Sequence, residues 1–492
     1  MSDDVLLAID QGTSSSRAMA FAPSGETVAA EQQAFEQIYP APGWVEHDPE
    51  VIWATVLSTT RQVLRRLDEL RAGVAAIGIT NQRETTVLWD KRDGVPLFNA
   101  IVWQDRRTAD RCRDLDRGGA GAELTQKTGL LLDPYFSATK IAWILDRVPG
   151  ARDAAAAGHI AFGTVDSFLI WRLTGGRAHL TDASNASRTA LYDIRRGRWD
   201  QALCEFFDVP MACLPEVRDT AADFGLTDAR VLGRAVPIRG VAGDQQAALV
   251  GQACFSAGDA KSTYGTGAFL MLNTAKELVT SKNRLLGTIA YRLRGETTYA
   301  LEGSILSAGS AIQWLRDGLG IIARASDVEP LAASVADANG VYLVPAFTGL
   351  GAPYWDADAR GALLGLTRAS GRGEIARAAL DSVAYQTYDL LDAMASDGLR
   401  PGKLQVDGGM AQNGLFMQRL ADVLGLDIQR PQITESTAFG AACLAGLGSG
   451  IYRSLGEIAA LARADATFTP SIGEPQRQAH IEGWRRALRR VR

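Results

Sequence analysis

Two short glycine-containing segments constrain this chain more than any other feature, because each predicts a tight hairpin between strands. They are Asp-Gln-Gly-Thr-Ser-Ser-Ser-Arg at residues 10–17 and Tyr-Gly-Thr-Gly at residues 264–267, with strand-like apolar residues at 5–9, 18–21 and 268–272. Glycine lets the backbone turn tightly and approach a ligand closely. The freed N–H groups and the hydroxyls form a cradle for an anion. One such hairpin in each half of the chain predicts two lobes that grip one polyphosphate.

The composition excludes several classes of protein. The 492 residues suffice for two or three domains. The formal net charge is −5, whereas nucleic-acid binders usually carry an excess of basic residues. Five scattered cysteines form no Cys-x-x-Cys pair and four histidines show no metal spacing, which argues against a disulfide framework and a zinc site. The acidic start is unlike a signal peptide, and no apolar run approaches the ~20 residues of a membrane span. We therefore expect a cytoplasmic protein that neither binds nucleic acid nor inserts into a membrane.

Alternating strand and helix patterns in both halves predict an α/β protein with two domains. One helix is expected to begin with Asp48 as N-cap and Pro49 in the first turn. We place the domain boundary near Gly251, which gives domains at residues 1–251 and 252–492. The other expected elements are strands at 74–80, 86–89 and 236–242, helices at 163–173, 304–319 and 412–424, and a mobile loop at 223–239.

The first hairpin contains residue types that suit phosphoryl chemistry. Asp10 can carry Mg²⁺ directly or through water. The hydroxyls and amides that follow can bind phosphate, and Arg17 can stabilise charge in a transition state. The alternative interpretation is an ordinary turn of a β-hairpin.

Polar residues that follow predicted strands are the candidates for an acceptor site. Asp244 is a candidate general base for a hydroxyl proton, and a helix N-cap is the alternative role, which is compatible with the first. Arg83 and Glu84 offer the donors and acceptors that a polyol needs, unless they form a surface ion pair. Loops at the carboxyl ends of strands are the usual ligand sites of open α/β sheets.

Three aromatic residues and one glycine turn complete the candidate site. Trp103, Tyr135 and Phe269 can enclose a small carbon skeleton, although each would also suit a hydrophobic core. The turn at Gly409 and Met410 would let a nucleotide lie against the backbone, or is simply a tight connection between strand and helix.

Taken together, these segments resemble the FGGY carbohydrate kinases, over nearly the whole chain and in the order of the family's motifs. The resemblance implies an actin/Hsp70-like (ribonuclease H-like) ATPase fold with a central cleft between two domains. The segments that carry it are residues 10–17, 81–86, 103–107, 133–143, 240–249, 264–267 and 349–356.

The resemblance also implies ATP-dependent phosphorylation of glycerol to sn-glycerol 3-phosphate, with Asp244 as the base and Arg17 as a further catalytic residue. The residues that it implies for Mg-ATP are Thr13, Ser14, Ser15, Arg17, Thr266, Gly309, Gln313, Gly409 and Met410. Those that it implies for glycerol are Arg83, Glu84, Tyr135, Asp244 and Gln245, and Trp103 and Phe269 complete the expected substrate site. A homodimer or homotetramer is the expected assembly.

Two other functions remain open at this point. One is phosphorylation of another small polyol or a ketose, which the Arg83-Glu84 pair and the aromatic set argue against. The other is an actin- or Hsp70-like switching ATPase, which would need a peptide-binding extension or a polymerising surface. The sequence ends soon after the second predicted lobe, which disfavours the chaperone.

Overall fold

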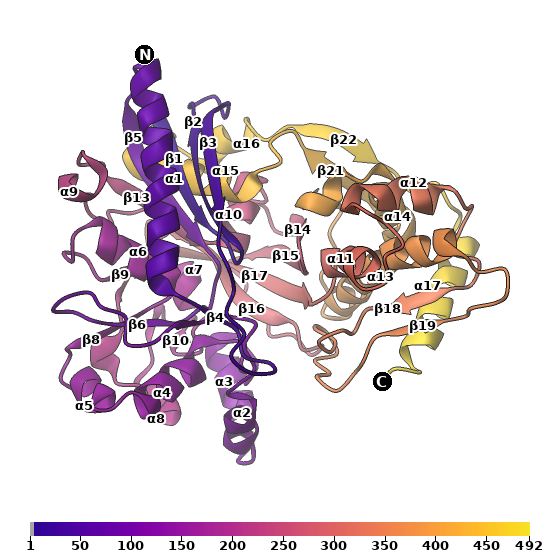
Figure 1. Cartoon of the computed structure of the whole chain (residues 1–492), viewed down its shortest axis with the longest axis horizontal. Coiled ribbons are helices and arrows are strands. Elements are labelled where there is room, and N and C mark those ends of the chain that lie inside the picture. Colours follow the sequence, from indigo (N-terminus) through magenta and orange to yellow (C-terminus); the bar gives the residue numbers. More distant parts are fainter. Residues whose placement is uncertain (1–3) are drawn as a thin grey trace.

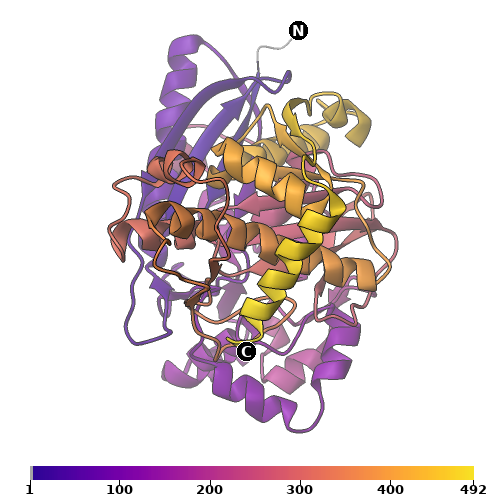
Figure 2. The same ribbon diagram turned by 90° about the vertical axis from the view of Figure 1, so that its right-hand side faces the viewer.

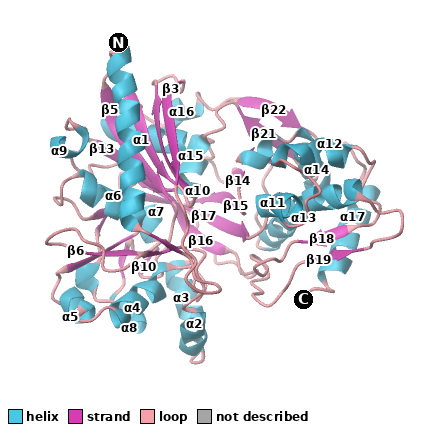
Figure 3. Ribbon diagram, viewed as in Figure 1, coloured by secondary structure: helices cyan, strands magenta, loops and turns pink. Residues whose placement is uncertain are grey.

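The computed structural model describes residues 4–492 as two lobes that lie side by side (Figure 1). Each lobe is built on a mixed β-sheet with helices packed against it (Figure 3). The predicted α/β class is therefore confirmed in both halves of the chain. The boundary at Gly251 stays a prediction.

The sheet of the N-terminal lobe positions three polar segments at one edge. Strands β1, β5 and β13 are parallel, and β2 and β3 extend the sheet as antiparallel neighbours of β1. In register, Asn81 lies opposite both Gln11 and Gly243. Because the three parallel strands end in register, the residues that follow them lie close together at the carboxyl edge of the sheet. The strands are β1 (Val5–Gln11), β2 (Ser15–Phe21), β3 (Thr27–Ala34), β5 (Val74–Asn81) and β13 (Ile238–Gly243).

The two faces of this sheet are covered by different parts of the chain. Alternating residues of β1 point to opposite sides: Leu7 packs with α1 (Pro49–Leu70) and α6 (Val165–Leu173), and Leu6 packs with α10 (Asp244–Gly251) and α15 (Ser436–Ser449). Helix α15 thus comes from the second half of the chain and covers the first sheet. It approaches α10 so closely that a Cβ on Gly440 would overlap the Ala247 carbonyl, so glycine is required there.

The sheet of the C-terminal lobe contains the same strand arrangement as the first hairpin, namely an antiparallel hairpin with a parallel strand beside it. Strands β14 and β15 form an antiparallel hairpin, and β20 runs parallel to β14 with Asp407 opposite Thr263. The strand order is β16-β17-β15-β14-β20-β21-β22. The strands are β14 (Ala260–Tyr264), β15 (Ala268–Ala275), β16 (Leu286–Leu293), β17 (Glu296–Ile305), β20 (Lys403–Asp407), β21 (Asp427–Pro431) and β22 (Ala464–Phe468).

Helices form the outer layer of the C-terminal lobe. The last of them lies across the outer surface (yellow in Figure 2) and buries Trp484 completely, with its indole N–H donating to Asp389 Oδ2 at 2.7 Å. The helices are α11 (Gly309–Asp317), α12 (Val328–Ala333), α13 (Arg372–Ser396), α14 (Gly414–Leu424) and α17 (Glu474–Leu488). The short helix α16 (Leu455–Ala459) instead packs beside α15, in the cluster that contains Leu6.

Shorter elements decorate the two sheets. Those of the N-terminal lobe are β4 (Glu46–His47), β6 (Val87–Asp90), β7 (Ala100–Ile101), α2 (Ala109–Asp116), α3 (Gly121–Thr128), α4 (Ser137–Arg147), α5 (Ala151–Ala156), β8 (Ile160–Gly163), β9 (Leu180–Asp182), α7 (Ala183–Ala186), β10 (Tyr192–Asp193), β11 (Arg198–Trp199), α8 (Gln201–Phe207), β12 (Glu216–Arg218) and α9 (Ala229–Leu232). Those of the C-terminal lobe include β18 (Tyr342–Val344), β19 (Ala362–Leu364) and the 3₁₀ turn η3 (Gly409–Gln412).

Several predicted elements need correction at their ends. The segment 163–173 is not one helix, because β8 continues to Gly163 before α6 begins at Val165. In the same way, β17 continues to Ile305, and α11 begins only at Gly309. The predicted loop at 223–239 contains the short helix α9, which Asp228 caps by accepting the Arg230 N–H at 2.8 Å.

The predicted start of α1 is confirmed. Asp48 caps α1 by accepting the Glu50 N–H at 2.8 Å, and Pro49 occupies the first turn. All five cysteines are free and buried. Residues 4–492 contain no cluster of three His, Cys, Asp or Glu side chains that could hold a metal ion. None of the helices within the same range combines the length and apolar character that a membrane span requires.

Candidate active site

A cavity of about 260 Å³ lies where the two hairpins meet the carboxyl edge of the first sheet. Both lobes contribute to its wall. The predicted residues that line it are Thr13, Ser14, Arg83, Glu84, Trp103, Tyr135, Asp244, Gln245, Thr266 and Phe269, and Gln37, Gln104, Thr263, Gly265 and Gly267 complete the wall. The structure therefore brings all the residues predicted for glycerol into one small space.

Both hairpins are tight turns closed by their own backbone. The Gly12 N–H donates to Ser15 O, and the Gly265 N–H donates to Gly267 O, each at 2.9 Å. The second turn is also bonded to the start of α11, because the Gly309 N–H donates to Gly265 O at 2.9 Å. A Cβ on Gly309 would lie 2.6 Å from that carbonyl, which explains why glycine begins the helix.

Arg83 and Glu84 follow β5 and are buried, with only 2% and 1% of their surface exposed. The surface ion-pair interpretation is therefore wrong. Glu84 has a φ of 59°, in the left-handed region that non-glycine residues seldom adopt. Backbone strain of this kind clusters at functional sites, and here it accompanies the turn that directs both side chains into the cavity wall.

The ionic partners of these two residues come from distant parts of the chain. Arg188, completely buried, donates to Glu84 Oε1 at 2.6 Å and to Glu302 Oε1 at 2.9 Å. Arg83 donates to Glu302 Oε2 at 2.5 Å. Burial alone would raise the pKa of Glu302, but Arg188 and Arg83 lower it to about 2. Glu302 thus stays ionised as the shared anion of two arginines.

The sequence analysis did not single out Arg188 or Glu302. Neither belongs to a glycine turn, and Glu302 lies inside β17 among apolar neighbours. A charged residue in a buried strand requires a partner of opposite charge. This requirement is the one signal in the sequence that could have pointed to Glu302.

Asp244 is the first residue of α10, and the N-cap position belongs to Gly243. The N-cap interpretation of Asp244 is therefore wrong by one residue. Its Oδ1 accepts the Gln245 N–H at 2.7 Å and lies 3.1 Å from Arg83 Nε. Because 28% of its side chain remains exposed, the carboxylate can reach a hydroxyl group in the cavity.

Gln245 is held by a second residue that the sequence analysis did not single out. Its Oε1 accepts a hydrogen bond from the ammonium group of Lys261, a buried residue of β14. Lys261 also donates to Thr263 Oγ1 at 3.0 Å. Burial lowers the pKa of Lys261 to about 8, although Asp407 and Asp244 oppose the shift.

The three aromatic side chains form one wall of the cavity. The ring of Trp103 lies 5.7 Å from those of Tyr135 and Phe269, in edge-to-face geometry. Its indole N–H donates to Thr13 Oγ1 at 2.9 Å. The predicted aromatic enclosure is thus present and is tied to the first hairpin.

Asp10 and its surroundings fit Mg²⁺. Burial raises the pKa of Asp10 to about 6, with Arg17 opposing and the nearby negative charge of Asp244 adding to the shift. A cation between two such carboxylates would relieve their repulsion. Mg²⁺ in kinases is commonly held by one or two carboxylates together with phosphates and water, so a larger protein cage is not required.

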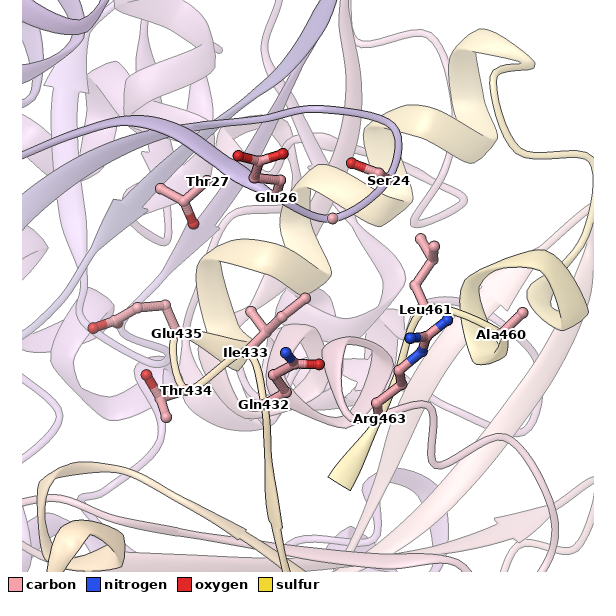
Figure 4. Close-up of a pocket in the computed structure, with 11 residues that line it drawn as sticks. Ser24, Glu26, Thr27, Gln432, Ile433, Thr434, Glu435, Ala460, Leu461 and Arg463 are labelled. Atoms are coloured by element: carbon pink, nitrogen blue, oxygen red, sulfur yellow. The ribbon is translucent and has the colours of Figure 1, made fainter. Parts of the chain in front are cut away.

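Arg17 does not line the 260 Å³ cavity. It forms an ion pair with Glu435, which precedes α15, and donates to Gln32 Oε1 at 3.3 Å. Glu435 lines a second, larger cavity of about 480 Å³ between the β2–β3 turn and the segment before α15 (Figure 4). Two carboxylates and one arginine, Glu26, Glu435 and Arg463, lie on its wall. Arg17 thus joins the two lobes.

The other residues predicted for the nucleotide lie outside the 260 Å³ cavity wall. Ser15 accepts from Gln32 at 2.8 Å. Gly309 and Gln313 lie on α11, with Gln313 exposed, whereas Gly409 and Met410 lie in η3. Their predicted contacts stay predictions.

The chain is similar to known proteins over its whole length. The chain is 58% identical over 488 residues to a glycerol kinase of Alteromonas mediterranea, covering 99% of both chains. It is 58% identical over 487 residues to a glycerol kinase of Alcanivorax borkumensis, covering 99% of this chain and 98% of the other. The crystal structure of Plasmodium falciparum glycerol kinase with ADP superimposes with a TM-score of 0.92 at 36% identity, covering 99% and 98% of the two chains.

Family models and folds lead to the same assignment. The N-terminal and C-terminal domain models of the FGGY family of carbohydrate kinases match residues 5–251 and 260–449. The predicted fold, two actin/Hsp70-like lobes around a cleft, is confirmed by the solved structures that this chain resembles. The chain belongs to the FGGY family of carbohydrate kinases.

Proposed function

We propose that this protein transfers the γ-phosphoryl group of ATP to a terminal hydroxyl of glycerol and so forms sn-glycerol 3-phosphate. The observation that carries the proposal is the shared cavity: Asp244, Arg83 and Glu84 line the same 260 Å³ space as the two Gly-Thr hairpins. The high identity to proteins named glycerol kinase supports it.

The cavity residues divide into two roles. Arg83, Glu84, Tyr135 and Gln245 would bind the glycerol hydroxyls, with Trp103 and Phe269 against the carbon chain. A polyol needs both donors and acceptors in close array, and this wall supplies both. The hydroxyls and amides of Thr13, Ser14 and Thr266 would bind the phosphates.

In the proposed step, Asp244 accepts the proton of the terminal hydroxyl. The hydroxyl oxygen forms a bond to the γ-phosphorus, the bond from that phosphorus to the bridging oxygen breaks, and ADP leaves with the electron pair. Mg²⁺ near Asp10 would neutralise charge on the phosphates. The aromatic wall would exclude water, which could otherwise accept the phosphoryl group.

The nucleotide residues outside the cavity wall are part of the proposal. We assign Ser15, Gly309, Gln313, Gly409 and Met410 to ATP. Ser15 lies in the first hairpin, Gly309 and Gln313 lie on α11, which is bonded to the second hairpin, and Gly409 and Met410 lie in the turn after β20. Arg17 would leave its ion pair with Glu435 and bind a phosphate group of ATP. There it would stabilise the negative charge of the transition state. We also propose a cytoplasmic location, which the use of ATP and the five free cysteines support. The expected homodimer or homotetramer stays a prediction that sedimentation velocity would test.

A coupled assay that detects ADP, run in parallel on glycerol, dihydroxyacetone, xylulose and gluconate, tests this proposal. Glycerol should give the highest kcat/KM. Fast turnover of a pentulose alone would exclude glycerol as the acceptor. ATP hydrolysis that is independent of glycerol and coupled to assembly would favour the switching ATPase instead.

A further inference from the structure

Both lobes contribute to the geometry of the polyol site, although its polar residues come from the N-terminal lobe. Arg83 and Gln245 line the cavity and follow β5 and β13. Each is held by one buried side chain of the C-terminal lobe: Glu302 on β17 binds Arg83, and Lys261 on β14 binds Gln245. Neither Glu302 nor Lys261 lines the cavity.

We propose that Glu302 and Lys261 are positioning residues for the acceptor, and that they set the orientation of Arg83 and Gln245 across the lobe interface. This inference rests on the proposed function, because it concerns how the same cavity recognises a polyol. The two residues touch no substrate in it and act only through the side chains that they bind.

The contacts of Glu302 are specific in geometry. Both of its carboxylate oxygens accept from Arg83, Oε2 from Nη1 at 2.5 Å and Oε1 from Nη2 at 3.2 Å. Oε1 also accepts from Arg188 Nη2 at 2.9 Å. With Nη1 and Nη2 engaged, Arg83 Nε remains directed to Asp244 Oδ1 at 3.1 Å. The side chains of Arg83 and Glu302 are almost completely buried, with 2% and 0% of their surface exposed, so solvent screens their attraction only slightly.

The contacts of Lys261 fix the orientation of Gln245 in a similar way. Its ammonium group donates to Gln245 Oε1 and to Thr263 Oγ1. An amide whose oxygen is engaged in this way presents its NH₂ group elsewhere. Lys261 therefore selects which end of the Gln245 amide a hydroxyl group in the cavity meets.

The shared property of the two contacts is that they cross from one lobe to the other. A change in the relation of β14 and β17 to the first sheet would move Glu302 and Lys261 and so reorient Arg83 and Gln245. Glycerol affinity is therefore expected to depend on the lobe arrangement, even though the residues that bind glycerol belong to one lobe.

Steady-state kinetics of Glu302→Gln and Lys261→Met test the proposal, with Asp389→Asn as the matched control. Asp389 is a buried carboxylate of the same lobe that binds Trp484 rather than the site. In each test variant the glycerol KM should rise by about tenfold or more, because the substitution leaves a buried polar group, Arg83 or Gln245, without its hydrogen-bond partner. The ATP KM should stay within about twofold, and the control should change neither constant.

Conservative variants separate positioning from loss of fold. Glu302→Asp and Lys261→Arg keep the charge and should recover part of the lost glycerol affinity, measured by isothermal titration calorimetry of glycerol binding without ATP. Equal increases of both KM values, or an unchanged glycerol KM in folded variants, would overturn the proposal. Absence of glycerol turnover by the wild type would instead contradict the proposed function.

Discussion

The indole N–H of Trp103 donates to the hydroxyl of Thr13 at 2.9 Å, and this bond joins the aromatic wall to the first phosphate hairpin. Thr13 therefore has one lone pair engaged and its proton free for another acceptor. The relationship couples the proposed polyol wall to the proposed phosphate cradle within one cavity.

Trp103→Phe removes this donor and keeps the ring contacts with Tyr135 and Phe269. Loss of one hydrogen bond costs about 1 kcal/mol, so kcat/KM should fall about fivefold. The coupled assay measures this change. Trp143→Phe, an aromatic change outside the cavity wall, should leave kcat/KM unaltered, and equal losses in both variants would refute a specific role for the Trp103–Thr13 bond.

Asp244→Asn keeps the size of the side chain but cannot accept the hydroxyl proton. We expect kcat to fall by about 10²–10⁴-fold, as is usual on loss of a general base. ATP binding, measured by isothermal titration calorimetry, should remain close to that of the wild type. Turnover near the wild-type rate would remove Asp244 from the role of base.

Glu435→Gln breaks the ion pair that holds Arg17. If Arg17 leaves Glu435 in order to bind phosphate, its release should lower the ATP KM by about twofold to fivefold, since partly exposed pairs contribute about 0.2–1 kcal/mol. Glu26→Gln is the matched control, a carboxylate of the same Figure 4 cavity that lies in the β2–β3 turn. An ATP KM that rises on substitution of Glu435 would count against the exchange.

Lys261 predicts a pH dependence of glycerol recognition. Burial lowers its pKa to about 8 from 10.5, with Asp407, Asp244 and Glu302 opposing the shift and Arg83 adding to it. The ammonium group is therefore charged below pH 8 and about 90% neutral at pH 9. Its bond to Gln245 should weaken over that interval.

The glycerol KM of the wild type should accordingly rise severalfold between pH 7 and pH 9. The same measurement on Lys261→Met should show a high KM without this pH-dependent step. The effect of pH on the free energy of unfolding has the opposite direction. Between pH 8 and 10.5 the Lys261 side chain is protonated in the unfolded chain but largely neutral in the folded one. This one group therefore stabilises the folded state more as pH rises. A flat profile in the wild type would contradict the assignment.

Local sequence signals predicted the parts of the fold and site that depend on short segments. The hairpins at residues 10–17 and 264–267, the Asp48 cap and the strand that precedes Arg83 needed only glycine turns, capping and periodicity. The convergence of Arg83 and Asp244 also followed, because parallel strands end at one edge.

The missing part of the site depends on contacts between distant segments. Arg188 follows the short helix α7, Glu302 lies within a buried strand and Lys261 precedes the second hairpin, so none has a local motif of its own. Their roles arise from ion pairs and hydrogen bonds to residues far away in the chain. The orientation of Arg17 toward Glu435 was unpredictable for the same reason, because Glu435 lies 418 positions further along the chain.

The packing of α15 on the first sheet has a consequence for dissecting this protein. A fragment that stops at Gly251 would lack the helix that covers Leu6 and Ala8, and would expose that apolar face to water. A single proteolytic cut or a simple truncation therefore cannot yield a self-sufficient first half. Mixing two separately expressed fragments should restore the helix to its sheet and regain the native state only when both are present.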